Sequence, residues 1–411
     1  MSDPGEQQPQ CCSSPKGPKR KQMADGNAAK EEKQRKWLAK QTKKQKLNQS
    51  QQDREKWFQM NSDYAVHVTL EDLEKLEKAG EKSPASSLAL PLASLLEPYR
   101  NIQDGSLSNG STQRERYFIA EGTETVRLLI QQFSRADQQR RRIPPVQLRS
   151  VFIKTSAFFE RPVLLQKDIE EAVVKSSKDN QKPFQVIVGS EELQSQVVGF
   201  SFCRGALACG VIPPWTQDED WLMEYLRRHP RFLRFNDVSV TSEKAAAMSQ
   251  QSSEPLRLLA LDGICDTANL GSMVRSASAF GVDAILLSKD CCDAWYRRSV
   301  RVSMGHCCRV PCVRVSDLVQ TLNRMQTELG VTSYAAVIDR DAECVLEKIE
   351  RGQVPGAWCC VMGNEGNGIS KPVARVCSTR LRIDMEDGVD SLSVPIATAI
   401  LLHGLNEREM K

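Results

Sequence analysis

The sequence is poor in the residues and segments that build metal sites and membrane spans. Its 411 residues include only 4 His, and no two of its 14 Cys form a Cys-x-x-Cys pair. Structural zinc sites usually combine such pairs with His, so no metal site is expected. No apolar run is long enough to span a membrane, and no secretory signal peptide is recognisable. We therefore expect an intracellular chain with no membrane and no metal partner, whose thiols are free in a reducing compartment.

Positive charge is abundant, but it is unevenly distributed. From Lys16 to Lys56, 14 Lys and Arg stand against 5 Asp and Glu, a net charge of +9, so the total of +4 leaves −5 elsewhere. A basic arm suits a polyanion such as RNA, although a solvated tail without a partner has the same composition. We expect residues 1–62 to be a basic tail that is disordered or at most transiently helical. The PKRK sequence at 18–21 fits a nuclear-localisation patch, so nucleus, nucleolus and mitochondrion all stay open.

Composition and periodicity divide the remainder into four segments. Residues 63–111 are expected to be a linker with short helices, the first of them capped by Thr69. Residues 112–215 alternate short apolar strands with helices and predict a small α/β domain. A connector at 216–250 then leads to a second α/β domain at 251–411.

In the second domain, apolar runs alternate regularly with helical stretches. The expected strands are 256–261, 284–287, 310–313, 334–338, 357–362 and 381–383, and the expected helices include 270–280, 316–329 and 396–405. Short and continuously apolar strands predict a parallel sheet that is covered on both faces. Ligands bind beyond the carboxyl ends of the strands in such a sheet.

Three polar, glycine-rich segments follow these strands. They are LDGICDTANLG at 261–271, which runs on to Arg275, VMGNEGNGI at 361–369, and IDMEDGVDSLSVPIA at 383–397. Glycines let a backbone approach a cofactor closely, and backbone amides can bind its polar groups. The spacing is not G-x-G-x-x-G, so a Rossmann-type dinucleotide site is not predicted.

In this order, the three segments resemble the signature motifs of the SpoU (TrmH-like) family, which are RNA ribose 2′-O-methyltransferases of the SPOUT class. The resemblance implies a parallel-sheet SPOUT domain with a trefoil knot, S-adenosyl-L-methionine as cofactor, and a homodimer that builds its active site across two subunits. Residues 112–215 are similar to the family's RNA substrate-binding domain at AEG (120–122), VGF (198–200) and RG (204–205). Cys203 stands where the family often has His before the Arg-Gly pair.

The resemblance also assigns roles to individual residues. Cofactor contacts are expected at Gly363, Ile383 and Leu392, together with Asn364, Gly366 and Gly368 of the same glycine-rich loop. Catalytic roles are expected for Asn269, Arg275, Glu365 and Ser393. Family proposals let the arginine activate the ribose hydroxyl. A guanidinium pKa above about 12 favours orientation and charge stabilisation instead.

Local sequence leaves other readings of these residues open. Asn269 is a natural helix N-cap, Arg275 could form a structural salt bridge, and Glu365 could brace its own loop. Ile383 and Leu392 also fit an apolar core. Ser393 replaces the Asn of the usual Ser-Leu-Asn and loses the reach of an amide.

Together these features predict a methyltransferase that modifies a ribose 2′-hydroxyl in rRNA or tRNA. The alternative is a catalytically weak or inactive SpoU-fold protein that binds RNA or assists ribosome assembly, and Ser393 motivates it. Methylation of a base is a third reading, but lineages with that activity carry different motifs.

Overall fold

The computed structural model describes residues 49–79, 91–100, 102, 116–134, 146–159, 164–178, 183–230 and 255–409, together with positions 36, 40, 41 and 43. The chain divides into one unit of residues 1–61 and another of residues 62–411. In the first unit, residues 49–60 are helical, so the expected disorder is wrong for this stretch. It contains neither Gly nor Pro and is rich in good helix formers. The PKRK patch at 18–21 lies outside the described residues.

The second unit begins with a five-stranded sheet. Its strands are β1 (Ala65–His67), β2 (Tyr117–Glu121), β3 (Leu148–Lys154), β4 (Gln185–Gly189) and β5 (Ala206–Val211), in the order β1-β4-β3-β5-β2. β5 runs antiparallel to β2 and β3, whereas the other pairs are parallel. The segment 63–111 is therefore more than a linker, because it supplies β1. A strand of three residues is too short to show a periodicity in the sequence.

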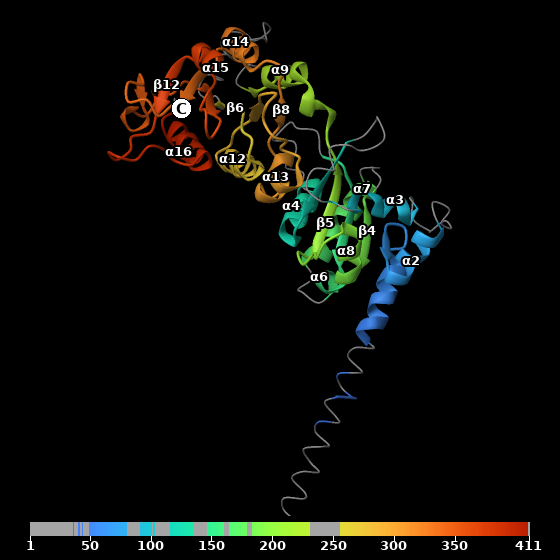
Figure 1. The fold of residues 1–411 in the computed structure, drawn as a ribbon. Coiled ribbons are helices and arrows are strands. Elements are labelled where there is room, and N and C mark those ends of the chain that lie inside the picture. Colours follow the sequence, from blue (N-terminus) through green and yellow to red (C-terminus); the bar gives the residue numbers. More distant parts are fainter. Residues whose placement is uncertain are drawn as a thin grey trace, which may run out of the picture. The chain divides into compact units, whose positions relative to one another are not determined.

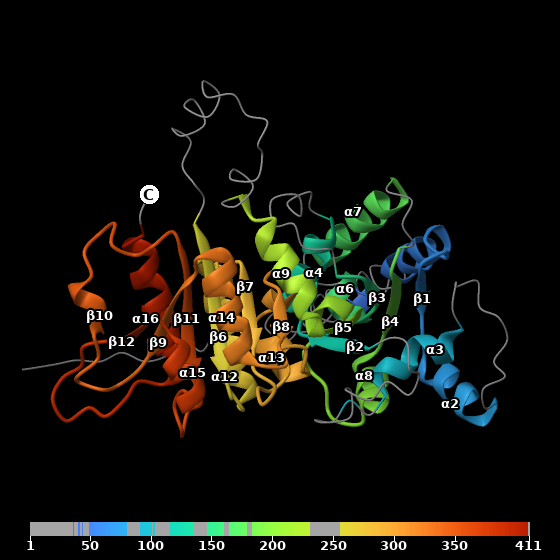
Figure 2. The same cartoon turned by 90° about the horizontal axis from the view of Figure 1, so that it is seen from above.

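Helices cover both faces of this sheet. One face carries α2 (Leu70–Ala79), α3 (Leu92–Leu96) and α8 (Glu191–Val198), and the other carries α4 (Thr123–Ser134) and α7 (Leu164–Lys178), as Figure 2 shows; α6 (Thr155–Phe159) follows β3. The predicted cap of α2 is confirmed, because Thr69 Oγ1 accepts a hydrogen bond of 3.3 Å from the amide of Asp72.

Residues 255–409 form a sheet of seven parallel strands. They are β6 (Leu256–Asp262), β7 (Ala284–Leu287), β8 (Cys312–Arg314), β9 (Thr332–Ala336), β10 (Cys344–Val345), β11 (Ala357–Gly363) and β12 (Thr379–Arg382). The order is β10-β12-β9-β11-β6-β7-β8, with β11 and β6 at the centre. The predicted parallel sheet is confirmed, and β10, with two residues, is the strand that the sequence did not predict.

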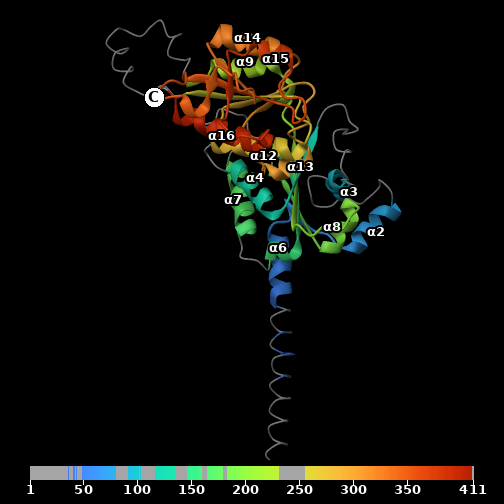
Figure 3. The same ribbon diagram turned by 60° about the vertical axis from the view of Figure 1, so that its left-hand side comes forward.

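This sheet also has helices on both faces. Figures 1 and 3 show α12 (Thr267–Ala279), α13 (Arg297–Val302) and α16 (Val394–Glu407) on one face, and α9 (Glu219–Arg227), α14 (Leu318–Leu329) and α15 (Lys371–Val376) on the other. The connector helix α9 is bound to α14, because Thr321 Oγ1 donates a hydrogen bond of 2.9 Å to Glu219 Oε1. Short 3-10 helices lie at Glu97–Tyr99, Pro214–Gln217, His306–Cys308 and Leu346–Lys348.

The described part of the chain shows neither a membrane-spanning helix nor a metal-binding cluster. No helix there is long and apolar enough to cross a lipid bilayer. Nor does that part contain a group of three or more His, Cys, Asp or Glu side chains that could hold a metal ion.

Candidate active site

A cavity of about 810 Å³ opens at the carboxyl edge of the parallel sheet. The loops after β9, β11 and β12 bound it, together with the first turns of α12 and α16. Its lining includes nine of the ten predicted site residues: Asn269, Gly363, Asn364, Glu365, Gly366, Gly368, Ile383, Leu392 and Ser393. Position and volume are those of a small-molecule site in an α/β sheet.

The loop after β11 requires glycine at two positions. A Cβ atom on Gly363 would lie 2.1 Å from the carbonyl carbon of Gly368, which no packing adjustment can accommodate. Gly368 itself has a φ of +68°, a conformation that L side chains rarely adopt. Two backbone hydrogen bonds of 3.0 and 2.9 Å between Asn364 and Gly368 close the loop. At these two glycines, the backbone can approach a ligand without a side chain in the way.

The side chain of Asn364 holds this loop in shape. Its Oδ1 accepts hydrogen bonds from the amides of Gly366 and Asn367, at 2.9 and 3.0 Å. Its Nδ2 donates to the carbonyl oxygen of Gly263, at 2.7 Å. Asn364 therefore ties the second motif to the first, and its three bonds are all internal to the protein.

Asn269 does not cap α12, so that reading of its role is wrong. Asp266 is the N-cap, and its Oδ1 accepts hydrogen bonds from the amides of Ala268 (2.7 Å) and Asn269 (2.8 Å). The hydrogen bond from the Asn269 amide, then that from Ala268 and the charge of Arg298, lower the pKa of Asp266. Because Asp266 takes the capping position, the Asn269 side chain is available for another partner.

That partner is Glu365 in the second motif. Asn269 Nδ2 donates a hydrogen bond of 2.8 Å to Glu365 Oε1, and Asn364 Nδ2 lies 3.4 Å from Glu365 Oε2. Glu365 is exposed at the cavity. The first two motifs thus meet in the pair of Asn269 and Glu365, whose carboxylate is held by Asn269 and faces the cavity.

The third motif contributes the start of α16. Ser393 occupies the N-cap position but makes no capping bond with its side chain, and Pro395 lies in the first turn, where proline is tolerated. Ile383 and Leu392 are partly buried in the cavity wall. They can therefore act both as core residues and as apolar contacts for a ligand.

Sequence reasoning missed the wall that the ends of β9 and β12 contribute. Ile338 lines the cavity with 63% of its surface exposed, next to Asp339. Arg380 lies on the same wall, where its Nε donates to Glu343 at 3.0 Å and its Nη1 lies 3.7 Å from Asp339. The strand predicted at 334–338 could have indicated this wall, because ligands bind beyond the ends of such strands.

Arg275 stands apart from the other predicted catalytic residues. It is exposed on α12 and does not line the cavity. It lies six residues after Asn269, which turns it by about 120° around the helix axis. Among the described residues, its side chain has neither an ion pair nor a hydrogen bond. One copy of the chain therefore does not bring the predicted catalytic set together.

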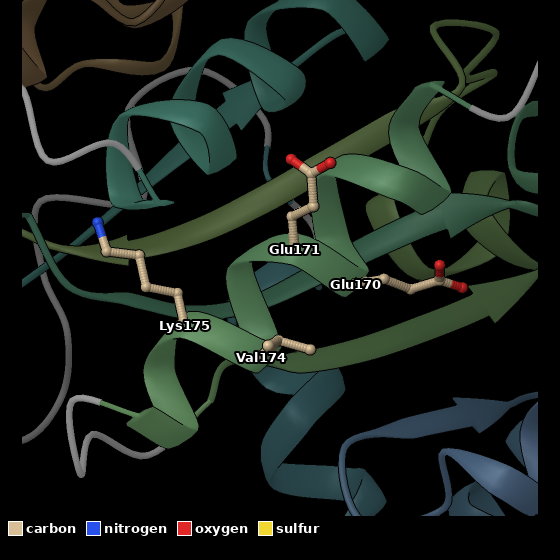
Figure 4. Close-up of a pocket in the computed structure, with 4 residues that line it drawn as sticks. All are labelled: Glu170, Glu171, Val174 and Lys175. Atoms are coloured by element: carbon tan, nitrogen blue, oxygen red, sulfur yellow. The ribbon is translucent and has the colours of Figure 1, made fainter.

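A second hollow, of about 350 Å³, lies on the domain of the five-stranded sheet. Its lining comes from a single helix, α7, through Glu170, Glu171, Val174 and Lys175. In Figure 4 these side chains point in different directions. They therefore do not form a converging set of polar groups, as a binding site requires.

The part of the chain that forms the parallel sheet matches a known family. The model of the SpoU rRNA Methylase family matches residues 257–403. An uncharacterized tRNA/rRNA methyltransferase of Mycobacterium bovis is 31% identical over 214 residues, which are 52% of this chain and 63% of that protein. A 23S rRNA (guanosine-2′-O-)-methyltransferase of Salmonella typhi is 34% identical over 146 residues, 35% of this chain and 57% of that protein. The matches thus span less than two thirds of these relatives.

Solved structures share the fold. The AdoMet-bound rRNA methyltransferase from Sinorhizobium meliloti aligns with 83% of this chain and 97% of its own, with a TM-score of 0.51 and 18% identity. At this identity the likeness concerns the fold alone. It extends beyond residues 257–403 and so includes part of the chain before the parallel sheet.

Proposed function

Because residues 257–403 belong to the SpoU rRNA Methylase family, we propose that this protein transfers a methyl group from S-adenosyl-L-methionine to a ribose 2′-hydroxyl in rRNA or tRNA. One observation carries the proposal. Three separate motifs converge on a single cavity at the carboxyl ends of parallel strands, and the pair formed by Asn269 and Glu365 joins two of them.

The residues of the cavity fit this cofactor. Its apolar wall includes Leu381, Ile383 and Leu392, and the exposed apolar surface of Ile338 gains burial when a base or a similar ring covers it. The glycine-rich loop adds backbone groups without side chains in the way. When bound, S-adenosylmethionine supplies a methyl group on a good leaving group.

The protein's own residues then have to orient the acceptor and provide for its proton. Asn269 holds Glu365 Oε1. Oε2 has one long contact, 3.4 Å from Asn364 Nδ2, and keeps a lone pair that can accept a hydrogen bond from the incoming hydroxyl. Arg275 orients the ribose or an adjacent phosphate and stabilises the developing charge on oxygen. Ser393 keeps one donor and one acceptor at the start of α16.

We further propose a homodimer in which Arg275 of one copy completes the cavity of the other. The outer face of α16 exposes Ile396 and Ile400, at 54% and 36%, although the helix is apolar on all sides. A helix of that kind is normally covered. Val394, Ala397 and Leu401 of the same helix line the cavity, so a second copy on the outer face would lie next to the site.

Three more expectations belong to this proposal. The trefoil knot of the family is proposed for residues 251–411, and RNA binding is proposed for the domain at 112–215. An intracellular location, in the nucleus, nucleolus, mitochondrion or elsewhere, stays a prediction, as does RNA binding by the basic tail.

The test is methyl transfer itself. The purified chain is incubated with methyl-labelled S-adenosylmethionine and total tRNA or rRNA, and the RNA is digested to nucleosides. Label in a 2′-O-methylated nucleoside supports the proposal, and Arg275→Ala should lower its formation at least about 100-fold. Label in a base overturns the ribose assignment. Cofactor binding without any transfer favours the RNA-binding or assembly role.

A further inference from the structure

A buried carboxylate joins the domain of the five-stranded sheet to the domain of the seven-stranded sheet. Glu121 ends β2 and is only 2% exposed, and its Oε2 accepts a hydrogen bond of 2.8 Å from Arg297 Nη1. Its Oε1 accepts from Arg301 Nη1, and Arg204 Nε lies 3.8 Å from the same oxygen. Two of these arginines come from α13, and Arg204 comes from the loop before β5.

The positive charge of this cluster exceeds its negative charge. Arg297 is 14% exposed and also lies over the ring of Phe200, at 5.4 Å, so it serves as the fixed partner of Glu121. Arg301 and Arg204 share the remaining carboxylate oxygen and are 32% and 51% exposed. Among the described residues, one carboxylate holds three guanidinium groups, so positive charge is in excess, and the two exposed arginines present it to solvent.

The loop around Arg204 is held in place by its backbone. Gly205 has a φ of +82°, its carbonyl oxygen accepts a hydrogen bond of 2.7 Å from the amide of Lys154, and Thr123 Oγ1 donates to the carbonyl oxygen of Arg204 at 3.3 Å. Both exposed guanidinium groups are thus attached to fixed backbone. Such preorganised arginine pairs bind phosphate oxygens with little loss of side-chain entropy.

The cluster also lies close to the first motif. A Cβ atom on Gly271 of α12 would be 2.7 Å from the carbonyl oxygen of Ser299 on α13. The charge of Arg298, the next exposed arginine on α13, lowers the pKa of Asp266 after the hydrogen bonds from the amides of Asn269 and Ala268. α13 therefore places its arginines beside the helix that carries Asn269 and Arg275.

From this arrangement, we propose that Arg204 and Arg301 form a phosphate-binding cradle, preorganised by Glu121, for the backbone of the substrate RNA. The inference rests on the proposed function, since it is RNA that brings the phosphodiester. A phosphate bound here offsets part of the excess positive charge at the junction of the two domains and directs the strand along α13 toward the first motif. The contact is with the backbone, so it carries no sequence preference.

The test uses the full chain and a short fluorescein-labelled oligouridylate, with fluorescence anisotropy measured over a range of NaCl concentrations. The variants are Arg204→Gln, Arg301→Gln and their combination. The control is Arg351→Gln, which removes a remote arginine that is 86% exposed and paired at 3.8 Å with Glu407. Thermal unfolding and binding of S-adenosylmethionine are followed in parallel.

In the double variant, we expect the slope of log K against log salt to become shallower by about 0.7, the value for one lost phosphate contact on a single strand. Affinity should fall roughly tenfold at moderate salt, while the control matches the wild type. An unchanged slope in folded double variant overturns the cradle and leaves a purely structural ion cluster. If the double variant does not fold, Arg204→Gln alone decides, with an expected change in the same direction of up to about 0.7.

This readout is independent of methyl transfer. A shallower slope in a protein that binds no cofactor would keep the cradle and reject the proposed enzyme. Normal methyl transfer with an unchanged slope would keep the proposed enzyme and reject the cradle.

Discussion

Neighbouring residues in the glycine-rich loop have different roles, and this decides which of them can be mutated informatively. Gly363 cannot carry a side chain, because even a Cβ atom would meet the backbone at Gly368. A substitution there would report on the collapse of the loop rather than on ligand contacts. Asn364 is a better probe, since its side chain can be shortened without a clash and its three hydrogen bonds are lost selectively.

We expect Asn364→Ala to weaken binding of S-adenosylmethionine by roughly 10- to 100-fold. Each lost hydrogen bond stabilises the binding conformation of the loop by about 0.5–1.5 kcal/mol. The measurement is calorimetric titration with the cofactor. Asn367→Ala is the matched control, since only the backbone amide of Asn367 bonds to Asn364. Equal affinities in the two variants would contradict the bracing role of Asn364.

At this scale, the sequence predicted nine residues that line one cavity, but it did not show how their side chains pair. Asp266 and Asn269 are both good N-cap residues, three positions apart, and a one-dimensional pattern does not decide which of them caps the helix. In the structure, Asp266 adopts the extended backbone of a cap, with φ of −83° and ψ of 120°. The bond from Asn269 to Glu365 then depends on a contact between residues 96 positions apart.

The start of α12 is the element whose stability should depend on pH. In the folded protein the hydrogen bond from the Asn269 amide, then that from Ala268 and the charge of Arg298, lower the pKa of Asp266. Its stabilising effect is therefore present above the unfolded pKa of about 3.9 and is lost as pH falls through the lower folded pKa. Asp266→Asn keeps an acceptor oxygen but does not titrate.

We therefore expect the difference in free energy of unfolding between wild type and Asp266→Asn to shrink as pH falls from about 6 to about 3. Asp266→Ala should lower the free energy of unfolding by about 1 kcal/mol at neutral pH, as for other lost N-caps. Urea unfolding at each pH measures both quantities. A difference that stays constant over this range would mean that Asp266 does not cap α12 as an anion.

The close approach of α12 and α13 gives a second prediction for these elements. Ala at Gly271 would place its Cβ atom 2.7 Å from the Ser299 carbonyl oxygen and 2.9 Å from the Cβ atom of Val302. We expect Gly271→Ala to destabilise the domain by about 1–3 kcal/mol, as overpacking does, and to speed hydrogen exchange in α13. Ser272→Ala, one residue further on, should change stability by less than about 0.5 kcal/mol.

Short elements mark the limit of prediction from the sequence. The longer strands and helices of the parallel sheet follow from their apolar runs, whereas β1, β10, α13 and α15 have two to six residues each. At those lengths tertiary contacts decide the conformation, as the pairing of β1 with β4 illustrates. The cluster at Glu121 was missed for the same reason, because it depends on where α13 packs.

For the whole molecule, the main question is where Arg275 acts. In a single chain it is exposed and outside the cavity, whereas the family resemblance predicts a catalytic role for it. The observation and the prediction agree if two copies associate through the apolar outer face of α16, so that Arg275 of each copy reaches the cavity of the other. A dimer with twofold symmetry makes two such sites at once.

Mixed dimers can separate action within one chain from action across two. Arg275→Ala leaves the cavity intact, whereas Ile383→Trp fills it and leaves Arg275 in place, so each variant alone should be inactive. If Arg275 acts across the interface, co-expression creates one complete site in every mixed dimer. Random pairing should then restore about a quarter of wild-type methyl transfer.

If Arg275 acts within its own chain, the mixture stays inactive, because no copy has both an open cavity and the arginine. Tagging the two variants differently allows the mixed dimers to be isolated before the assay, which excludes poor association as the cause. A double variant that carries both changes, paired with wild type, is the matched control. If Arg275 acts within its own chain, this pair should give about half of wild-type activity. If Arg275 acts across the interface, the pair should be almost inactive, because each cavity then lacks either space or its arginine.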